Sequence, residues 1–232
     1  MSATLFCLNS ACSCALEDSR CHPFQRSLFL LCDERLYTDV ITALGDQIKA
    51  QVLSSPQPTF AASIMDILAR APETFVLVGT SYGGNLALEL ALSAPERVRA
   101  LWLMGCDHIA AQASGPDLAA GLDAAPDAVT EMLSGLMVRQ EDTVAAGKFR
   151  DMAHKVGGAA GAAGAAGARA NGARADLAGR LSKLTMPALI MFGEEGAVVS
   201  VATGRDLAAA LPNAQFQQID ACGHLPTLEQ PA

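Results

Sequence analysis

The residues Phe75–Gly84 (FVLVGTSYGG) decide the fold of this chain. They begin with four apolar residues in a row, two of them β-branched, which predicts a strand that is buried on both faces. The apolar run breaks at Gly79, and helical spacing starts after Gly84. Ser81 therefore lies in a sharp turn between a strand and a helix, inside a Gly-x-Ser-x-Gly sequence whose small residues allow strained dihedral angles. Such a turn, a nucleophile elbow, holds a serine hydroxyl out of the sheet.

The segment after the turn supports chemistry at Ser81. Residues Asn85–Ala94 place leucines among alanines and stop before Pro95, so they predict a helix whose N-terminal amides and positive dipole end point toward Ser81. The amide of Tyr82 would then face a developing oxyanion. Gly-x-Ser-x-Gly also arises by chance in turns rich in glycine and serine, but a buried strand before it and a helix after it favour the catalytic interpretation.

Composition limits the class of protein. The 232 residues are enough for one α/β domain with an insertion, and they can bury a core of their own. A formal charge of −8 argues against nucleic acid or an anionic membrane as a partner. Hydrophobic residues make up 51% of the chain, yet no apolar run approaches the ~20 residues of a membrane span. We therefore expect a soluble protein.

The cysteines are concentrated near the N-terminus. Five of the seven fall within the first 32 residues, but no Cys-x-x-Cys pair is matched by a second pair, which argues against a metal site. An odd number of cysteines suggests reduced thiols and a cytoplasmic location. No lysine or arginine precedes Arg20, so a signal peptide fits poorly.

The apolar periods predict alternating strands and helices. Residues 1–26 have no clean period, and the first strand is expected at Ser27–Leu31. A helix ending near Ala50 is expected next, followed by a short strand at residues 51–53. The further expected elements are a helix capped by Thr59 and reaching Ala71, strands at 75–78, 98–104, 186–193 and 214–219, and a helix at 202–211.

Strands separated by helices of this length indicate parallel βαβ units, whose ligands bind beyond the carboxyl ends of the strands. The expected fold is α/β, with a mostly parallel sheet formed by residues 27–108 and 184–232. Residues 109–183 predict a helical cap insertion for substrate selection, in which the alanine and glycine tract at 157–167 would form a weak helix. A terminal helix that packs on the sheet would be expected to begin where this sequence ends.

Four separated motifs resemble the α/β-hydrolase superfamily, specifically its compact esterase, enol-lactonase and iminopeptidase-like branch. The motifs are Gly79–Gly84, Ala94–Val98, Met186–Glu195 and Gly223–Pro231, and they occur in the order found in the superfamily. The resemblance implies that Ser81 is the nucleophile and that His224 is the general base. Independently of the family, a histidine with a pKa near ~6.5 can take the serine proton and return it to a leaving group. This chemistry requires no metal or organic cofactor.

The third member of the expected triad is missing from its usual place. The superfamily pattern has Gly-x-x-Asp after the penultimate strand, whereas this chain reads Gly193-Glu194-Glu195-Gly196 there and so has Gly196 at the position of the aspartate. A triad without its acid loses the group that orients the imidazole. Two replacements are available: Asp107, at an alternative acid position used by some members, and Glu195, one residue before Gly196. His108 is a competing candidate for the base.

The oxyanion hole also departs from the pattern. Relatives carry His-Gly or Pro-Gly after their first buried strand, and this chain has neither at Ser27–Cys32, so Leu30 is the expected second amide donor by position. The leading hypothesis is a serine hydrolase that cleaves small carboxylic esters or lactones through an acyl-enzyme. The alternative is a catalytically weakened relative that binds small molecules. Acyl transfer and perhydrolysis would use the same residues.

Overall fold

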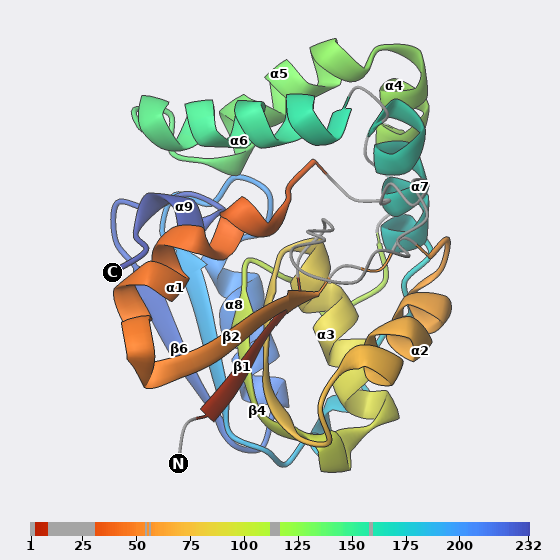
Figure 1. The fold of residues 1–232 in the computed structure, drawn as a ribbon, viewed down its shortest axis with the longest axis vertical. Helices are drawn as coiled ribbons and strands as arrows, with labels where there is room; N and C mark the ends of the chain where they lie inside the picture. Colours follow the sequence, from red (N-terminus) through yellow and green to blue (C-terminus); the bar gives the residue numbers. More distant parts are fainter. Residues whose placement is uncertain (1–2, 9–30, 54, 56, 112–116, 158–159) are drawn as a thin grey trace, which may run out of the picture.

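The computed structural model describes residues 3–8, 31–53, 55, 57–111, 117–157 and 160–232. Six strands in this part of the chain form one sheet in which every neighbouring pair is parallel (Figure 1). The strands are β1 (Ala3–Leu8), β2 (Ile48–Leu53), β3 (Phe75–Thr80), β4 (Val98–Met104), β5 (Ala188–Gly193) and β6 (Ala214–Ile219), in the order β2-β1-β3-β4-β5-β6. The fold class predicted from the sequence is confirmed.

Helices cover both faces of this sheet. The helices are α1 (Thr38–Leu44), α2 (Phe60–Arg70), α3 (Tyr82–Ser93), α4 (Leu118–Ala124), α5 (Pro126–Met137), α6 (Thr143–Gly157), α7 (Ala160–Gly172), α8 (Val201–Ala210) and α9 (Pro226–Glu229). Side chains of α2, α3 and α8 form one core cluster with alternate residues of the strands, such as Leu77 and Leu103. The other strand residues, such as Val78 and Met104, pack with α9 and the segment that leads into α1. This alternation follows from the two-residue period of a strand.

The helical insertion leaves the sheet after β4 and returns before β5. Its helices α4–α7 lie beyond the carboxyl ends of the strands, at the top of Figure 1. Helix α7 packs closely on α4, and the small Ala165 is fully buried there. The glycine-rich tract therefore forms a helix supported by packing, since small side chains allow two helices to approach. The insertion is confirmed as helical and is consistent with a cap.

The N-terminal part of the sheet differs from the sequence prediction. The first strand is Ala3–Leu8, within a segment for which no element was expected, and it pairs with β2 on one edge and β3 on the other. Its sequence, Ala-Thr-Leu-Phe-Cys-Leu, shows no clean period, and its place in the sheet depends on pairing with two strands that lie far away in the sequence. Residues 27–30 of the expected first strand lie outside the described residues, and Leu31 is a bend with φ of 65°.

The helix expected to end near Ala50 ends earlier. Helix α1 stops at Leu44, because Gly45 takes a φ of 52° and turns the chain into β2. The elements from α2 onward lie close to their expected positions, and the Thr59 side chain caps α2 by accepting a hydrogen bond of 3.2 Å from the amide of Ala62. No helix in the described ranges is long and apolar enough to cross a membrane.

Candidate active site

Ser81 lies at the turn between β3 and α3 with φ of 54° and ψ of −120°, a backbone conformation that is rare for residues other than glycine. The turn closes only because its flanking residues are small. A Cβ atom on Gly79 would lie 2.4 Å from the carbonyl oxygen of Gly83, and one on Gly84 would lie 2.5 Å from the Cβ of Cys106. The amide of Ser81 donates a hydrogen bond of 2.8 Å to Met104 of β4, which ties the turn to the sheet.

His224 reaches Ser81 from a loop 143 residues further along the chain. The loop follows β6 and leads into α9, and His224 itself is only 2% exposed. Its Nε2 lies 2.9 Å from Ser81 Oγ. This is the separation expected of a nucleophile and its base. The structure thus brings together the two residues that the sequence predicted to react.

Burial changes the acid–base behaviour of His224. Because the imidazole is removed from water, its charged form is disfavoured and its pKa falls from 6.5 to about 4. The ring is therefore neutral at physiological pH, as a general base must be. A pKa this low also makes the imidazole a weaker base than one oriented by a carboxylate, which would stabilise the imidazolium.

Close backbone contacts fix the place of the imidazole. Gly105 follows β4 with φ of 54°, and a Cβ atom there would lie 2.9 Å from His224 Cε1 and 3.0 Å from its Nδ1. Gly193, at the end of β5, is more crowded still, since its Cβ would lie 1.9 Å from the carbonyl oxygen of Gly223. The loop that carries His224 thus packs directly on the backbone at the ends of β4 and β5.

The second nitrogen of His224 has no hydrogen-bond partner among the described residues. Nδ1 is buried and makes no hydrogen bond within the part of the chain that the structure describes. Gly196, which holds the place of the family aspartate, lies beside the loop: a Cβ atom there would be 3.7 Å from the carbonyl oxygen of Gly223 and 3.2 Å from that of Val199. The described residues therefore contain a Ser–His pair without a hydrogen-bonded acid.

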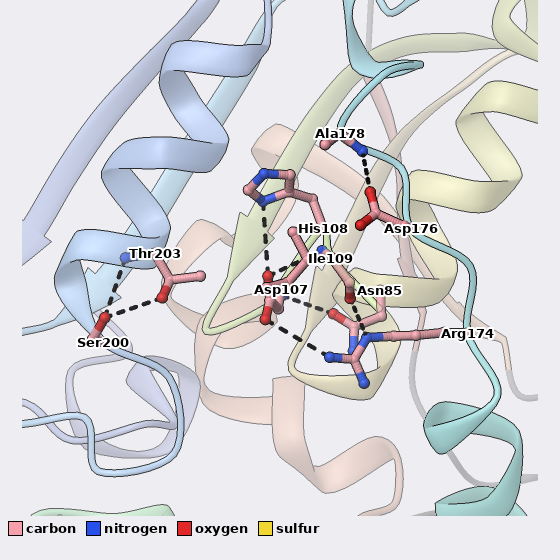
Figure 2. A network of polar contacts seen from close by, with 9 residues as sticks. All are labelled: Asn85, Asp107, His108, Ile109, Arg174, Asp176, Ala178, Ser200 and Thr203. Atoms are coloured by element: carbon pink, nitrogen blue, oxygen red, sulfur yellow. Dashed lines mark hydrogen bonds and ion pairs between the residues drawn. The ribbon is translucent and has the colours of Figure 1, made fainter. Parts of the chain in front are cut away.

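Asp107 has other partners (Figure 2). Its amide donates to Asn85 Oδ1 at 2.8 Å, and its Oδ1 accepts from the amide of Ile109 at 3.1 Å. Its Oδ2 lies 3.7 Å from Arg174, and its Oδ1 lies 3.8 Å from His108 Nδ1. These contacts join the two ends of the cap insertion, and the role of Asp107 as the triad acid stays a prediction.

Further contacts complete this cap junction, which we define as Asn85, residues 107–109, Asn171 and residues 174–177. The amide of Leu177 donates to the carbonyl oxygen of His108 at 2.8 Å, so the outgoing and returning chains lie side by side. Asn85 Nδ2 donates to Asn171 Oδ1 at 2.8 Å. The guanidinium of Arg174 donates to the carbonyl oxygens of Ile109 and Asn171. His108, the competing base, thus belongs to the junction.

Glu195 faces the cap. Its Oε1 lies 3.6 Å from the guanidinium of Arg139, and its side chain is 43% exposed. The amide of Glu195 donates to the carbonyl oxygen of Cys222 at 2.8 Å, which holds the two loops together through their backbones. Its role as the acid also stays a prediction.

The expected oxyanion donors are only partly described. Tyr82 is the first residue of α3, directly after Ser81, and its amide lies at the positive end of the helix dipole. Its side chain turns away and meets Phe60 edge to face, with ring centroids 5.1 Å apart. Leu30 lies outside the described residues.

Two side chains that support the Ser81 turn and the His224 loop were not predicted from the sequence. Tyr37 is fully buried beneath the elbow and donates to the hydroxyl of Thr80 at 3.0 Å. Glu229 accepts hydrogen bonds from the amides of Gly223 and Leu225, the two neighbours of His224. Glu229 falls in the Gly223–Pro231 motif, so its fixed place after the histidine was the available signal.

Three described thiols are buried. Cys32, Cys106 and Cys222 are free, and burial raises the pKa of each thiol to about 12. No group of three or more His, Cys, Asp or Glu side chains in the described ranges could hold a metal ion.

Curated proteins with similar sequences are hydrolases. A 2-hydroxy-6-oxononadienedioate/2-hydroxy-6-oxononatrienedioate hydrolase from Paraburkholderia phymatum is 31% identical over 169 residues, covering 64% of this chain and 55% of that protein. A pimeloyl-[acyl-carrier protein] methyl ester esterase from Aliivibrio salmonicida is 28% identical, covering 72% of this chain and 68% of its own length. The chain spans little more than half the length of the first of these.

Solved structures share the fold at low identity. The enol-lactonase of Burkholderia xenovorans superposes with a TM-score of 0.80 at 18% identity, covering 99% of this chain and 87% of its own. A thermophilic esterase from Thermogutta terrifontis gives 0.73 at 20% identity, covering 99% and 86%. The sequence model of the alpha/beta hydrolase family matches residues 18–232 of this chain. Together with the elbow, the parallel sheet and the helical insertion, this match shows that the chain belongs to the alpha/beta hydrolase family.

Proposed function

We propose that this protein is a serine hydrolase that cleaves small carboxylic esters or lactones with a Ser81–His224 pair. The observation that carries the proposal is the 2.9 Å contact between Ser81 Oγ and His224 Nε2, made by a serine held in strained geometry at a helix N-terminus. Relatives named as a methyl ester esterase and as a 2-hydroxy-6-oxononadienedioate/2-hydroxy-6-oxononatrienedioate hydrolase support hydrolysis as the reaction class. The substrate would enter between the cap and the carboxyl ends of the strands.

The reaction would proceed in two halves. Ser81 Oγ attacks the acyl carbon while His224 Nε2 takes its proton, and the developing oxyanion faces the amide of Tyr82. The imidazolium then returns the proton to the leaving alkoxide, which departs and leaves an ester on Ser81. In a lactone the alkoxide remains tethered to the acyl group. Water, deprotonated by His224, attacks this ester and releases the acid.

The expected rate follows from the low pKa of His224 and from its Nδ1, which has no hydrogen-bond partner in the described ranges. Without a hydrogen-bonded acid, the imidazolium formed in the transition state lacks its usual stabilisation. We therefore expect turnover slower than that of an enzyme with a complete triad. The same observation favours the second candidate function, a small-molecule binding protein that keeps the hydrolase pocket.

Hydrolysis of p-nitrophenyl acetate tests the proposal. We expect Ser81→Ala and His224→Ala each to lower kcat by about 10³-fold, because each removes one member of the pair. Glu131→Gln, a change on the exposed side of α5, is the matched control and should leave kcat unchanged. Equal rates in the wild type and both site variants would refute the proposal.

Covalent labelling separates the two candidates. A fluorophosphonate probe should label Ser81 in a hydrolase and leave Ser81→Ala unlabelled. A binding protein would instead show thermal stabilisation by ligands without labelling.

Asp107→Asn and Glu195→Gln test the predicted acids. Both side chains have other partners here, so we expect less than about a tenfold loss of kcat in either variant. A larger loss in one of them would identify it as the acid.

A further inference from the structure

Glu229 holds the backbone on both sides of His224. Its Oε2 accepts a hydrogen bond of 2.8 Å from the amide of Gly223, and its Oε1 accepts one of 3.3 Å from the amide of Leu225. These residues immediately precede and follow the histidine. Hydrogen bonds to an ionised group are stronger than neutral ones, so one carboxylate here restrains the path of the whole loop.

The same carboxylate reaches the cap. Glu229 Oε2 also accepts a hydrogen bond of 2.8 Å from the amide of Arg139, directly after α5 and Val138. Contact between these segments leaves no room for a side chain on the loop, since a Cβ atom on Gly223 would lie 2.5 Å from the amide nitrogen of Arg139. Glu229 is thus enclosed by backbone donors from the histidine loop and from the cap.

Burial and hydrogen bonding act in opposite directions on this carboxyl group. Desolvation raises the pKa of Glu229, while the amides of Arg139, Gly223 and Leu225 lower it, and the net direction is upward. A half-buried carboxylate that accepts three backbone hydrogen bonds is costly to replace, because each donor would lose its partner. No comparable hydrogen bond restrains the imidazole at Nδ1, which has no partner in the described residues.

We infer that Glu229 is the positioning residue for His224: it holds the loop by its backbone, so that Nε2 stays on Ser81 although no carboxylate of the described residues binds Nδ1. This inference rests on the proposed function of the Ser81–His224 pair. In a complete triad the acid orients the ring directly. Here the orientation would come from the loop anchored by Glu229 and from the contact of the ring with Gly105.

The test compares Glu229→Gln with Glu194→Gln. Glutamine keeps the size of the side chain but turns an NH₂ group toward backbone donors, so the anchor is weakened. Glu194 is a matched control, because its carboxylate accepts from the amide of Ala221 in the same loop, at 3.4 Å, without flanking His224. We expect fluorophosphonate labelling of Ser81 to slow about tenfold in Glu229→Gln and less than twofold in Glu194→Gln. With an ester substrate, kcat should fall while KM stays nearly constant.

A second readout does not depend on reactivity. The titration of the His224 ring, followed by NMR and assigned with His224→Ala, should move upward by at least one pH unit in Glu229→Gln, because water reaches a loosened ring. If the wild type is not labelled at all, the proposed function fails, and a shifted titration still supports the positioning role. An unchanged titration in Glu229→Gln overturns the inference, and so does an unchanged labelling rate in a protein whose wild type reacts. A change in melting temperature alone counts against it.

Discussion

The cap junction and the His224 loop lie at the same edge of the sheet, but they differ in how far their buried polar groups are hydrogen-bonded. In the junction, both ends of the Asn85 amide are hydrogen-bonded, and Arg174 and Asp107 each contact several groups. In the loop, Glu229 anchors the backbone, but Nδ1 of His224 is buried and has no hydrogen-bond partner in the part of the chain that the structure describes. A buried unsatisfied polar atom costs about 1–3 kcal/mol, so it needs a reason to persist.

The difference separates a structural role from a functional one. The contacts of the junction hold the cap on the sheet. One polar atom of the junction is unsatisfied as well: His108 Nδ1 is buried and makes no hydrogen bond in the described part of the chain. The loop is built to deliver a single nitrogen to Ser81. Backbone strain is present on both sides of the Ser81–His224 contact, because Ser81 and Ala221 both have positive φ, which is unfavourable for residues other than glycine.

The largest expected effect tests the packing of the loop. Gly105→Ala would place a Cβ atom 2.9 Å from the imidazole, so we expect the ring to move and kcat to fall about 10²-fold. Gly45→Ala is the matched control, since Gly45 has a similar φ of 52° but nothing within 4 Å of the added carbon. Both variants share a backbone strain of about 1 kcal/mol, measured as a loss in the free energy of unfolding. Equal kcat values for the two variants would mean that the contact with Gly105 does not position the ring.

A gain of activity tests the missing acid. Gly196→Asp places a carboxylate where the family has one, beside the loop that carries His224. We expect kcat on p-nitrophenyl acetate to rise about tenfold and the pKa of His224 to increase, because a nearby negative charge favours the imidazolium. Gly196→Asn, of the same size and without charge, is the control. A drop in kcat for both variants would show that the site has no room for the acid.

The pH dependence follows from the lowered pKa of His224. The neutral imidazole is the active form, so kcat/KM should stay level as the pH falls from 7 and decline only near the folded pKa of about 4. Stability should respond over a wider interval, because between pH 6.5 and 4 the unfolded chain binds a proton that the folded chain does not. This linkage lowers the free energy of unfolding by about 3 kcal/mol as the pH falls from 6.5 to 4.

Two comparisons check the linkage. Chemical denaturation at pH 7 and pH 5 measures the loss, and His224→Ala should lose less over the same interval. An acid limb of kcat/KM near pH 6.5 in the wild type would show that the ring is hydrated in solution.

The smallest effect on catalysis is expected in the junction. Arg174→Met removes two hydrogen bonds to carbonyl oxygens at the base of the cap, so we expect a loss of about 2 kcal/mol in unfolding free energy and less than a tenfold change in kcat. Arg169→Met is the control, because its pair with Asp123 is exposed and should contribute less than about 0.5 kcal/mol. A larger effect of Arg174→Met on kcat than on stability would assign the junction a part in the reaction.

Local patterns predicted the fold from α2 onward. The apolar run of β3, the glycines around Ser81 and the cap at Thr59 act within a few residues, and the structure places these elements close to their expected positions. The end of α1 and the strand β1 were missed. A single glycine at position 45 decided the first, and pairing with two distant strands decided the second.

The site divides along the same line. The sequence by itself determined the candidate nucleophile and base, since each lies in a motif whose spacing carries its chemistry. Only the tertiary structure decided which charged groups support them: it engaged Asp107 with the cap, turned Glu195 toward Arg139 and placed Glu229 behind His224. Contacts of this kind depend on how loops from different strands meet at the sheet edge, and no local pattern encodes that meeting.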